Sequence, residues 1–192
     1  MTIDIAPNSA LLVIDVQKGF DDASFWGPRN NPAAEANIAA LMDAWQATGR
    51  PVVLVRHASV RPGSVLAADH PGYAFKDFVE ERRGRRQESL LVTKTVNSAF
   101  YGTPDLGDWL KGNGIGQVVV AGIQTNMCVE TTARMAGNLG YEVLVPLDAT
   151  HTFDLEGPEG MSLTADQLAT ATAVNLQGGG FARVVTTAEL LA

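Results

Sequence analysis

The sequence is poor in cysteine, in positive charge and in long apolar runs. Cys128 is the only cysteine among 192 residues, so no internal disulfide forms and the unpaired thiol suits a reducing compartment. Lysine and arginine number 14 against 21 acidic residues, a net charge of −7, which argues against nucleic acid or an anionic membrane surface as partner. No run approaches bilayer-spanning length, and the N-terminus lacks a basic stretch followed by an apolar one. We expect a cytoplasmic protein with a small-molecule partner.

Repeats and low-complexity segments are also missing, which argues against a solenoid or a disordered linker. The composition is 46% hydrophobic and 18% charged, with a mean hydropathy of +0.05, as in ordinary globular proteins. A chain of this length buries a substantial core as one unit. We therefore expect residues 1–192 to form a single domain.

Apolar strand-like runs alternate with helical periodicity along most of the chain. The expected strands are 10–16, 51–55, 90–92, 118–121, 142–146 and 183–185. The expected helices are 33–48, 104–111, 129–139 and 164–176, followed by a short terminal helix. This alternation predicts an α/β fold with three α/β/α layers around a doubly wound, Rossmann-like sheet of six mostly parallel strands.

The segment 56–88 is the least regular part of the sequence. It holds His57 and His70 with several prolines, glycines and aromatic residues. Long irregular insertions in compact domains usually serve as functional loops or lids, and the sequence leaves open whether this one is a lid or an interface. The charged run 80–86 (EERRGRR) is most simply a solvated face, with an anion site as the alternative.

Cys128 stands where a buried strand passes into a helix. The apolar run 118–121 ends at Gly122, and helix-forming residues begin directly after the cysteine. The first N–H groups of a helix are unpaired and its N-terminal dipole is positive, which favours thiolate, the nucleophilic form. A lone cysteine is also often only a small buried hydrophobe. Ligands in open α/β sheets bind at the carboxyl ends of strands, and this placement favours a functional thiol.

Asp15 and Lys94 fall at or near the ends of two other expected strands. Carboxyl ends of parallel strands lie on one edge of a sheet, so these two residues and Cys128 can converge there. A carboxylate can accept the thiol proton, and an ammonium group lowers the pKa of both neighbours. A structural hydrogen-bond anchor is the other reading of a buried Asp15. Together the three supply what attack on an acyl carbon needs, without a metal.

Four segments carry a resemblance to a known family: IDVQKGF at 14–20, KTVNSAFYGT at 94–103, VAGIQTNMCVETTARMAGNLGYEV at 120–143 and PLDAT at 146–150. With them the sequence resembles the isochorismatase-like cysteine hydrolases, which include nicotinamidases and N-carbamoylsarcosine amidases. The segments span nearly the whole domain in the order of the family. The resemblance implies the isochorismatase-like hydrolase fold and, as is common in that family, a homo-oligomer.

The resemblance also implies roles for individual residues. The catalytic acid of the family falls on Asp15, its lysine on Lys94 and its nucleophile on Cys128. A cis peptide bond would join Ile123 to Gln124 and turn the Gln124 N–H beside that of Cys128, forming an oxyanion hole. The implied activity is hydrolysis of a small amide, with release of ammonia or an amine, through a thioester intermediate.

The sequence departs from nicotinamidases at one place. Those enzymes carry an Asp-x-His pair and a further histidine as metal ligands after the second strand, whereas this chain has RHAS at 56–59. Two histidines without a carboxylate are a poor zinc site, so we expect no metal, no other cofactor and a substrate other than nicotinamide. Hydrolysis of a vinyl ether, as in isochorismatases, or of an ester or lactam stays an alternative. A thiol-based small-molecule sensor without turnover is a further one.

Substrate contacts are expected from residues near the same strand ends. Phe20, Tyr73, Phe75 and Phe100 are candidates for an apolar wall, His57 for a direct contact, and Asn97 and Asn126 for orienting a polar group. Aromatic residues that only pack the core, and a structural His57, remain alternatives.

Overall fold

The computed structural model describes residues 3–192, and its centre is one parallel sheet in the strand order β3-β2-β1-β4-β5-β9. The strands are β1 (Ala10–Ile14), β2 (Val52–His57), β3 (Leu90–Lys94), β4 (Gln117–Ile123), β5 (Glu142–Pro146) and β9 (Arg183–Val185). The two-residue β6 (Thr150–His151) pairs with the end of β4. The six main strands confirm the predicted doubly wound sheet.

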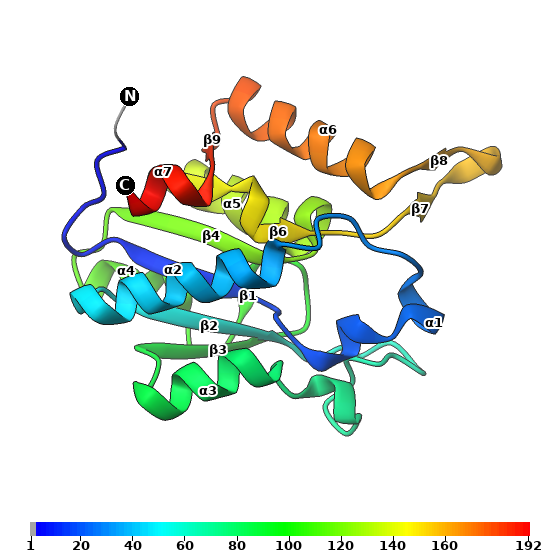
Figure 1. Ribbon diagram of the computed structural model, residues 1–192, viewed down its shortest axis with the longest axis horizontal. Coiled ribbons are helices and arrows are strands. Elements are labelled where there is room, and N and C mark those ends of the chain that lie inside the picture. The colour runs from blue at the N-terminus through cyan, green and yellow to red at the C-terminus, as the bar shows by residue number, and fades with distance from the viewer. Residues whose placement is uncertain (1–2) are drawn as a thin grey trace.

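Helices cover both faces of this sheet (Figure 1). Apolar residues of α2, α3 and α7 pack on one face, and those of α4, α5 and α6 on the other. The bounds are α1 (Ala23–Trp26), α2 (Ala34–Thr48), α3 (Asp77–Arg85), α4 (Leu106–Gly112), α5 (Glu130–Asn138), α6 (Ala165–Gly178) and α7 (Thr187–Leu191). Short turns are η1 (Lys18–Asp21), η2 (Pro71–Tyr73), η3 (Ala99–Tyr101), η4 (Thr125–Val129), η5 (Leu147–Ala149) and η6 (Pro158–Gly160). The central strands are buried on both faces because the two layers cover them.

Two elements lie where the sequence predicts irregular chain. The first is α3, whose residues are mostly charged and therefore show no apolar periodicity. Its arginines contact acids of the chain itself: Arg82 with Asp43, and Arg83 with Glu80 and Glu88. These pairs fit a solvated helix face better than an anion site. The second is a hairpin of β7 (Leu155–Glu156) and β8 (Ser162–Leu163), whose exposed two-residue strands are too short for a sequence pattern.

A close contact between β1 and β4 sets the spacing at the centre of the sheet. Gly122 pairs in register with Ile14 and has a φ of 128°. A Cβ atom built on Gly122 would lie 2.1 Å from the carbonyl oxygen of Ile14. Only glycine tolerates both this φ and this approach. The residues that follow these two strands, Asp15 and Gln124, are thereby held at the same edge.

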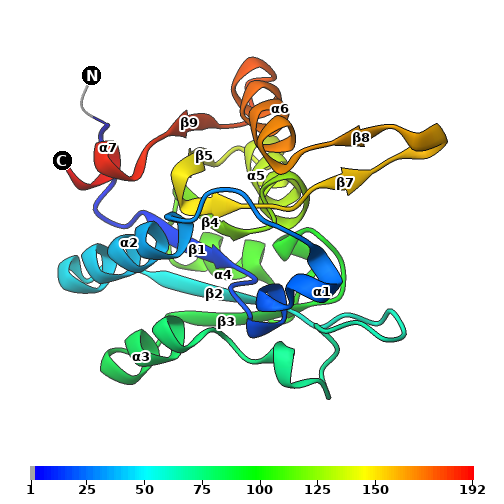
Figure 2. The same ribbon diagram turned by 45° about the vertical axis from the view of Figure 1, so that its right-hand side comes forward.

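The edge formed by the carboxyl ends of the strands is surrounded by irregular chain. Figure 2 shows α1, the chain after β2 and the β7–β8 hairpin projecting from this end of the molecule, with both termini at the opposite end. No helix in the described range is long and apolar enough to cross a membrane.

Candidate active site

Lys94, the last residue of β3, lies among three groups that come from other strand ends. Its Nζ atom is 2.6 Å from Asp15 Oδ2, 3.3 Å from Cys128 Sγ and 3.1 Å from His57 Nδ1. The structure therefore brings the three predicted catalytic residues together and adds His57 to them. The parallel register explains this meeting, since His57 pairs directly with Lys94 and Ile14 with Gly122.

Asp15 follows β1 in a strained conformation. Its φ is 50°, in the left-handed region that costs a non-glycine residue about 1 kcal/mol or more. Its ion pair with Lys94 is fully buried, with 0% exposure of both side chains. Buried pairs rarely add net stability because desolvation offsets their attraction. The Oδ1 atom is also buried and has no hydrogen-bond partner among the described residues, so this oxygen is free to accept a proton.

His57 is held in a fixed and neutral form. The Gln17 side chain accepts a hydrogen bond from the His57 N–H and donates one to the His57 carbonyl. A lysine ammonium has only donors, so Nδ1 accepts from Lys94 and Nε2 carries the ring proton. Burial, followed by the charge of Lys94, lowers the pKa of His57. The imidazole thus contributes no positive charge to the site.

The pKa of the Cys128 thiol is subject to opposing influences. Burial, and then the charge of Asp15, raise the pKa of the Cys128 thiol, while Lys94 acts in the opposite direction. Cys128 lies in the π-type turn η4, at the start of the helical segment. The position at the helix start favours thiolate, whereas burial and the charge of Asp15 favour the thiol. Burial also acts to lower the pKa of Lys94, but Asp15 and Cys128 together raise it above its ordinary value, so the ammonium is charged.

The expected cis peptide bond between Ile123 and Gln124 is present. It lies directly before η4, and its residues border the same edge as Asp15. The backbone N–H groups of Gln124 and Cys128 remain our proposal for an oxyanion hole.

A cavity of about 730 Å³ opens onto these groups. Asp15, His57 and Cys128 line its floor, and its walls come from η1, α1, β7 and the loops after β2 and β3. Phe20 and Trp26 form one wall, with their ring centroids 5.0 Å apart. Pockets of this size with mostly apolar walls are typical of small-molecule sites.

A buried polar network lies behind this aromatic wall. Phe153 stacks on Trp26, and the edge of His151 meets Phe153. Arg29 contacts His151 Nε2 at 3.1 Å and Glu35 at 2.5 Å, and Glu35 also pairs with a buried lysine, Lys76. Burial, and then the charges of Arg29 and Lys76, lower the pKa of His151 to about 3. His151 is therefore a neutral residue that supports the wall.

The predicted substrate contacts divide into two groups. Phe20, His57 and Asn97 line the cavity, and Asn97 Oδ1 lies 3.9 Å from the Cys128 sulfur. Phe100 instead stacks on Tyr141, and the Asn126 side chain accepts a hydrogen bond from Thr152. Neither of these two lines the cavity. Tyr73 and Phe75 do not line it either, and both of their rings lie under the Arg56 guanidinium.

Sequence reasoning missed several residues that line the cavity: Phe25, Trp26, Val60, Arg61, Met127 and Leu155. The aromatic pair at 25–26, which follows shortly after the strand that leads to Asp15, was a usable signal. The contribution of Leu155 was not, because it depends on the unpredicted hairpin.

One cluster at this site consists of residue types that can bind a metal ion. Ligand atoms of Asp15, His57 and Cys128 lie within 4.8 Å of one another. All three residues face the Lys94 ammonium group, which already supplies a cation at their centre. His70 does not join them, since its Nδ1 accepts a hydrogen bond from the Gly72 N–H.

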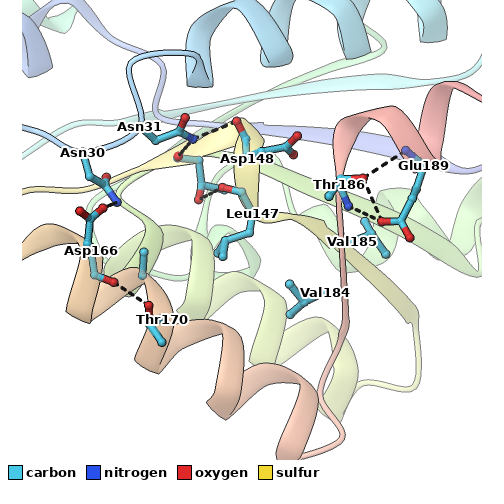
Figure 3. A pocket seen from close by; sticks show the side chains of 12 residues that line it. Asn30, Asn31, Leu147, Asp148, Asp166, Thr170, Val184, Val185, Thr186 and Glu189 are labelled. Carbon is cyan, nitrogen blue, oxygen red and sulfur yellow. Dashed lines mark hydrogen bonds between the residues drawn. The ribbon is translucent and has the colours of Figure 1, made fainter.

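A second cavity, of about 610 Å³, lies away from these groups between η5, α6, β9 and α7 (Figure 3). Its polar side chains are bonded within the protein. Asn31 donates to the carbonyls of Asp148 and Thr150, and Asn30 donates to Asp166. These bonds tie the chain before α2 to η5 and α6, and we assign this cavity a structural role.

Comparison with known proteins gives consistent matches over nearly the whole chain. Residues 9–178 match the model of the isochorismatase domain. A Bacillus subtilis isochorismatase family protein, YrdC, is 38% identical over 95% of this chain and 94% of its own length. A crystal structure of an isochorismatase family protein from Chromobacterium violaceum is 41% identical, covers 100% of this chain and 96% of that one, and superposes with a TM-score of 0.90.

Two further relatives are named for an activity. A streptothricin hydrolase of Streptomyces noursei is 36% identical over 83% of this chain and 61% of its own length. Nicotinamidase 3 of Arabidopsis thaliana is 33% identical over 78% of both chains.

Proposed function

This chain belongs to the isochorismatase family of hydrolases, and on that premise we propose that it hydrolyses the C–N bond of a small amide through a thioester on Cys128. In this proposal Asp15 is the general base and acid, and Lys94 is the electrostatic partner of Asp15 and Cys128. The substrate lies in the 730 Å³ cavity above them.

The observation that carries the proposal is the position of the Lys94 ammonium group. It contacts Asp15 Oδ2 at 2.6 Å and Cys128 Sγ at 3.3 Å at the floor of the cavity. A fully buried ion pair is costly to maintain for stability alone. Beside a nucleophile, however, it has a use, since it stabilises the charge that develops on sulfur.

Attack begins from the thiol. Asp15 Oδ1, which lacks a partner, accepts the Cys128 proton as sulfur bonds to the carbonyl carbon. The negative charge moves to the carbonyl oxygen, where the N–H groups of Gln124 and Cys128 donate hydrogen bonds. Coupling the proton transfer to attack suits a thiol whose pKa is raised by burial and by Asp15.

Collapse of this intermediate releases the amine. Asp15 gives its proton to the departing nitrogen, the C–N bond breaks, and the acyl group remains on sulfur as a thioester. Asp15 then takes a proton from water as the water oxygen attacks the thioester carbon. The carboxylic acid leaves, and the cysteine sulfur regains the proton from Asp15.

The relatives support the assignment of this protein as a hydrolase. Two of them are named as a streptothricin hydrolase and a nicotinamidase. Nicotinamide is not our choice of substrate here, because the chain after β2 reads RHAS at 56–59 without an acid. Turnover also separates the proposal from a thiol sensor, for which a buried Asp–Lys pair has no evident use.

The test is ammonia release from a panel of small primary amides, with the Cys128→Ala protein as the blank. We expect release from at least one member that depends on Cys128, together with a mass increase equal to the acyl group when the reaction is quenched early. Release that is unchanged in Cys128→Ala would overturn the covalent scheme. Release of acid from esters or vinyl ethers but not from amides would replace the amide by that bond.

A further inference from the structure

The cavity carries an unbalanced positive charge although the protein as a whole is acidic. The net charge of the chain is −7. At the cavity, however, the charge of Asp15 is cancelled by Lys94, and His57 is neutral because its pKa is lowered. Arg61 is the remaining charged residue of the lining. The cavity therefore has a net charge of about +1 by this count, since Arg is always protonated.

The Arg61 side chain also has no partner among the described residues, unlike the side chains of most arginines of this chain. Others are paired with acids, as Arg82 is with Asp43, or stacked on rings, as Arg56 is on Tyr73 at 4.2 Å. Within residues 3–192 no carboxylate or carbonyl accepts a hydrogen bond from the Arg61 guanidinium. Its bonds are made by the backbone, whose N–H donates to Ser59 Oγ and whose carbonyl accepts from the Ser64 N–H. All its side-chain donors are available to a ligand.

Two hydroxyl groups on the same loop line the cavity with Arg61. Ser59 Oγ accepts the Arg61 N–H, and Ser64 Oγ accepts the Leu66 N–H. Each hydroxyl oxygen thus accepts a hydrogen bond from a backbone N–H, and neither hydroxyl proton has an acceptor in the described part of the chain. Two hydroxyl donors and a guanidinium on one loop match the oxygens of a carboxylate.

Much of the rest of the cavity wall is apolar. Phe25, Trp26, Val60 and Leu155 contribute to it, and all but Trp26 are exposed at 44% or more. A volume of about 730 Å³ is far larger than a carboxamide group needs. The space between Cys128 and the loop after β2 therefore suits an apolar spacer.

Resting on the proposed amide hydrolysis, we propose that the substrate is an amide whose acyl part carries a carboxylate at the far end of an apolar spacer. Arg61, with the hydroxyls of Ser59 and Ser64, binds that carboxylate and sets the specificity. A single free cation matches the single charge of a carboxylate better than the double charge of a phosphate monoester.

The experiment compares half-amides of dicarboxylic acids with matched amides that end in a hydroxymethyl group, over aliphatic and aromatic spacers. Binding to the Cys128→Ala protein is measured by calorimetry. Ammonia release is measured with the unmodified protein. We expect the carboxylate to improve both Kd and kcat/KM by about tenfold or more, the effect of a charge-assisted bond. Added salt should weaken this preference, since Arg61 is exposed.

Arg61→Gln should abolish the preference by raising KM for the half-amide with little change in kcat. Arg183→Gln is the matched control, an exposed arginine on β9 that does not line the cavity, and it should keep the preference. Equal binding of both ligand series, or a preference that survives in Arg61→Gln, would overturn the carboxylate site while leaving amide hydrolysis standing. A preference in binding without any ammonia release would keep the site and overturn the amide chemistry.

Discussion

The Lys94 ammonium and the Asp15 carboxylate form an ion pair of 2.6 Å in which neither side chain has any exposed surface. The pair joins the ends of β3 and β1, which are not neighbours in the sheet, because β2 lies between them. It is therefore a contact across the edge formed by the carboxyl ends of the strands. Asp15 and Lys94 can be substituted singly or together.

Replacing Lys94 by methionine should reduce both stability and activity. The Asp15 carboxylate would be left buried without a counter-charge, at a cost of about 3–5 kcal/mol. We expect the double variant Asp15→Asn with Lys94→Met to recover much of that loss, because no charge remains. Activity should stay at least about a hundredfold reduced in both proteins. Urea unfolding and ammonia release measure the two effects, and a fully stable Lys94→Met protein would refute the uncompensated-charge argument.

The titration of Cys128 should respond to its neighbours with opposite signs. In the unmodified protein we expect the thiol to be mainly protonated at pH 9.0, the ordinary pKa, because burial and Asp15 raise its own value. Asp15→Asn should lower the pKa and Lys94→Met should raise it. Thiolate absorbance or the pH dependence of alkylation reports this directly, since the chain has one cysteine. Shifts of the same sign in both variants would contradict the assignment.

Stability should fall with acid through His151. Its pKa is 6.5 when unfolded and about 3 in the folded protein, so below pH 6.5 the unfolded state binds a proton that the folded state does not. The contribution of the neutral ring is complete above pH 6.5 and declines by about 1 kcal/mol per pH unit toward pH 3. Arg29 and Lys76 oppose its protonation and Glu35 favours it.

Urea unfolding at pH 7, 6 and 5 measures that decline in the free energy of unfolding in steps of one pH unit. His151→Gln, which keeps an acceptor for Arg29, should flatten the dependence. His70→Gln serves as the control, because that ring is exposed, and should leave the dependence as it is. An equal slope in the His151→Gln protein would assign the pH effect to other groups.

Activity should not depend on a divalent metal. The oxygen, nitrogen and sulfur atoms that might bind one already surround the Lys94 ammonium, whose charge would repel a metal ion at short distance. We expect prolonged treatment with a chelator to leave ammonia release within about twofold of the untreated protein, a difference well below one kcal/mol. Loss of activity on chelation, with recovery on adding zinc or manganese, would contradict this expectation.

The sequence predicted the meeting of Asp15, Lys94 and Cys128 better than the cavity above them. Asp15, Lys94 and Cys128 each follow or end a strongly apolar strand, and parallel strands align such positions whatever the loops do. Trp26 and Leu155 reach the cavity through a four-residue helix and a short hairpin, which leave no periodic signal. The balance of influences on the thiol pKa could not be predicted, because desolvation and the Asp15 charge depend on tertiary packing. The homo-oligomer and the cytoplasmic location stay predictions.

The origin of the two parts of the site bears on how such a protein diversifies. The reacting groups are fixed by the sheet, where the contact of Gly122 with the Ile14 backbone leaves no room for a side chain. The walls are carried by α1, the loop after β2 and the hairpin, all of which lie at the surface. Mutations in these loops change what is recognised without moving the chemistry. A mutant library for a new substrate therefore belongs at residues such as Val60, Arg61 and Leu155, and not at the strand ends.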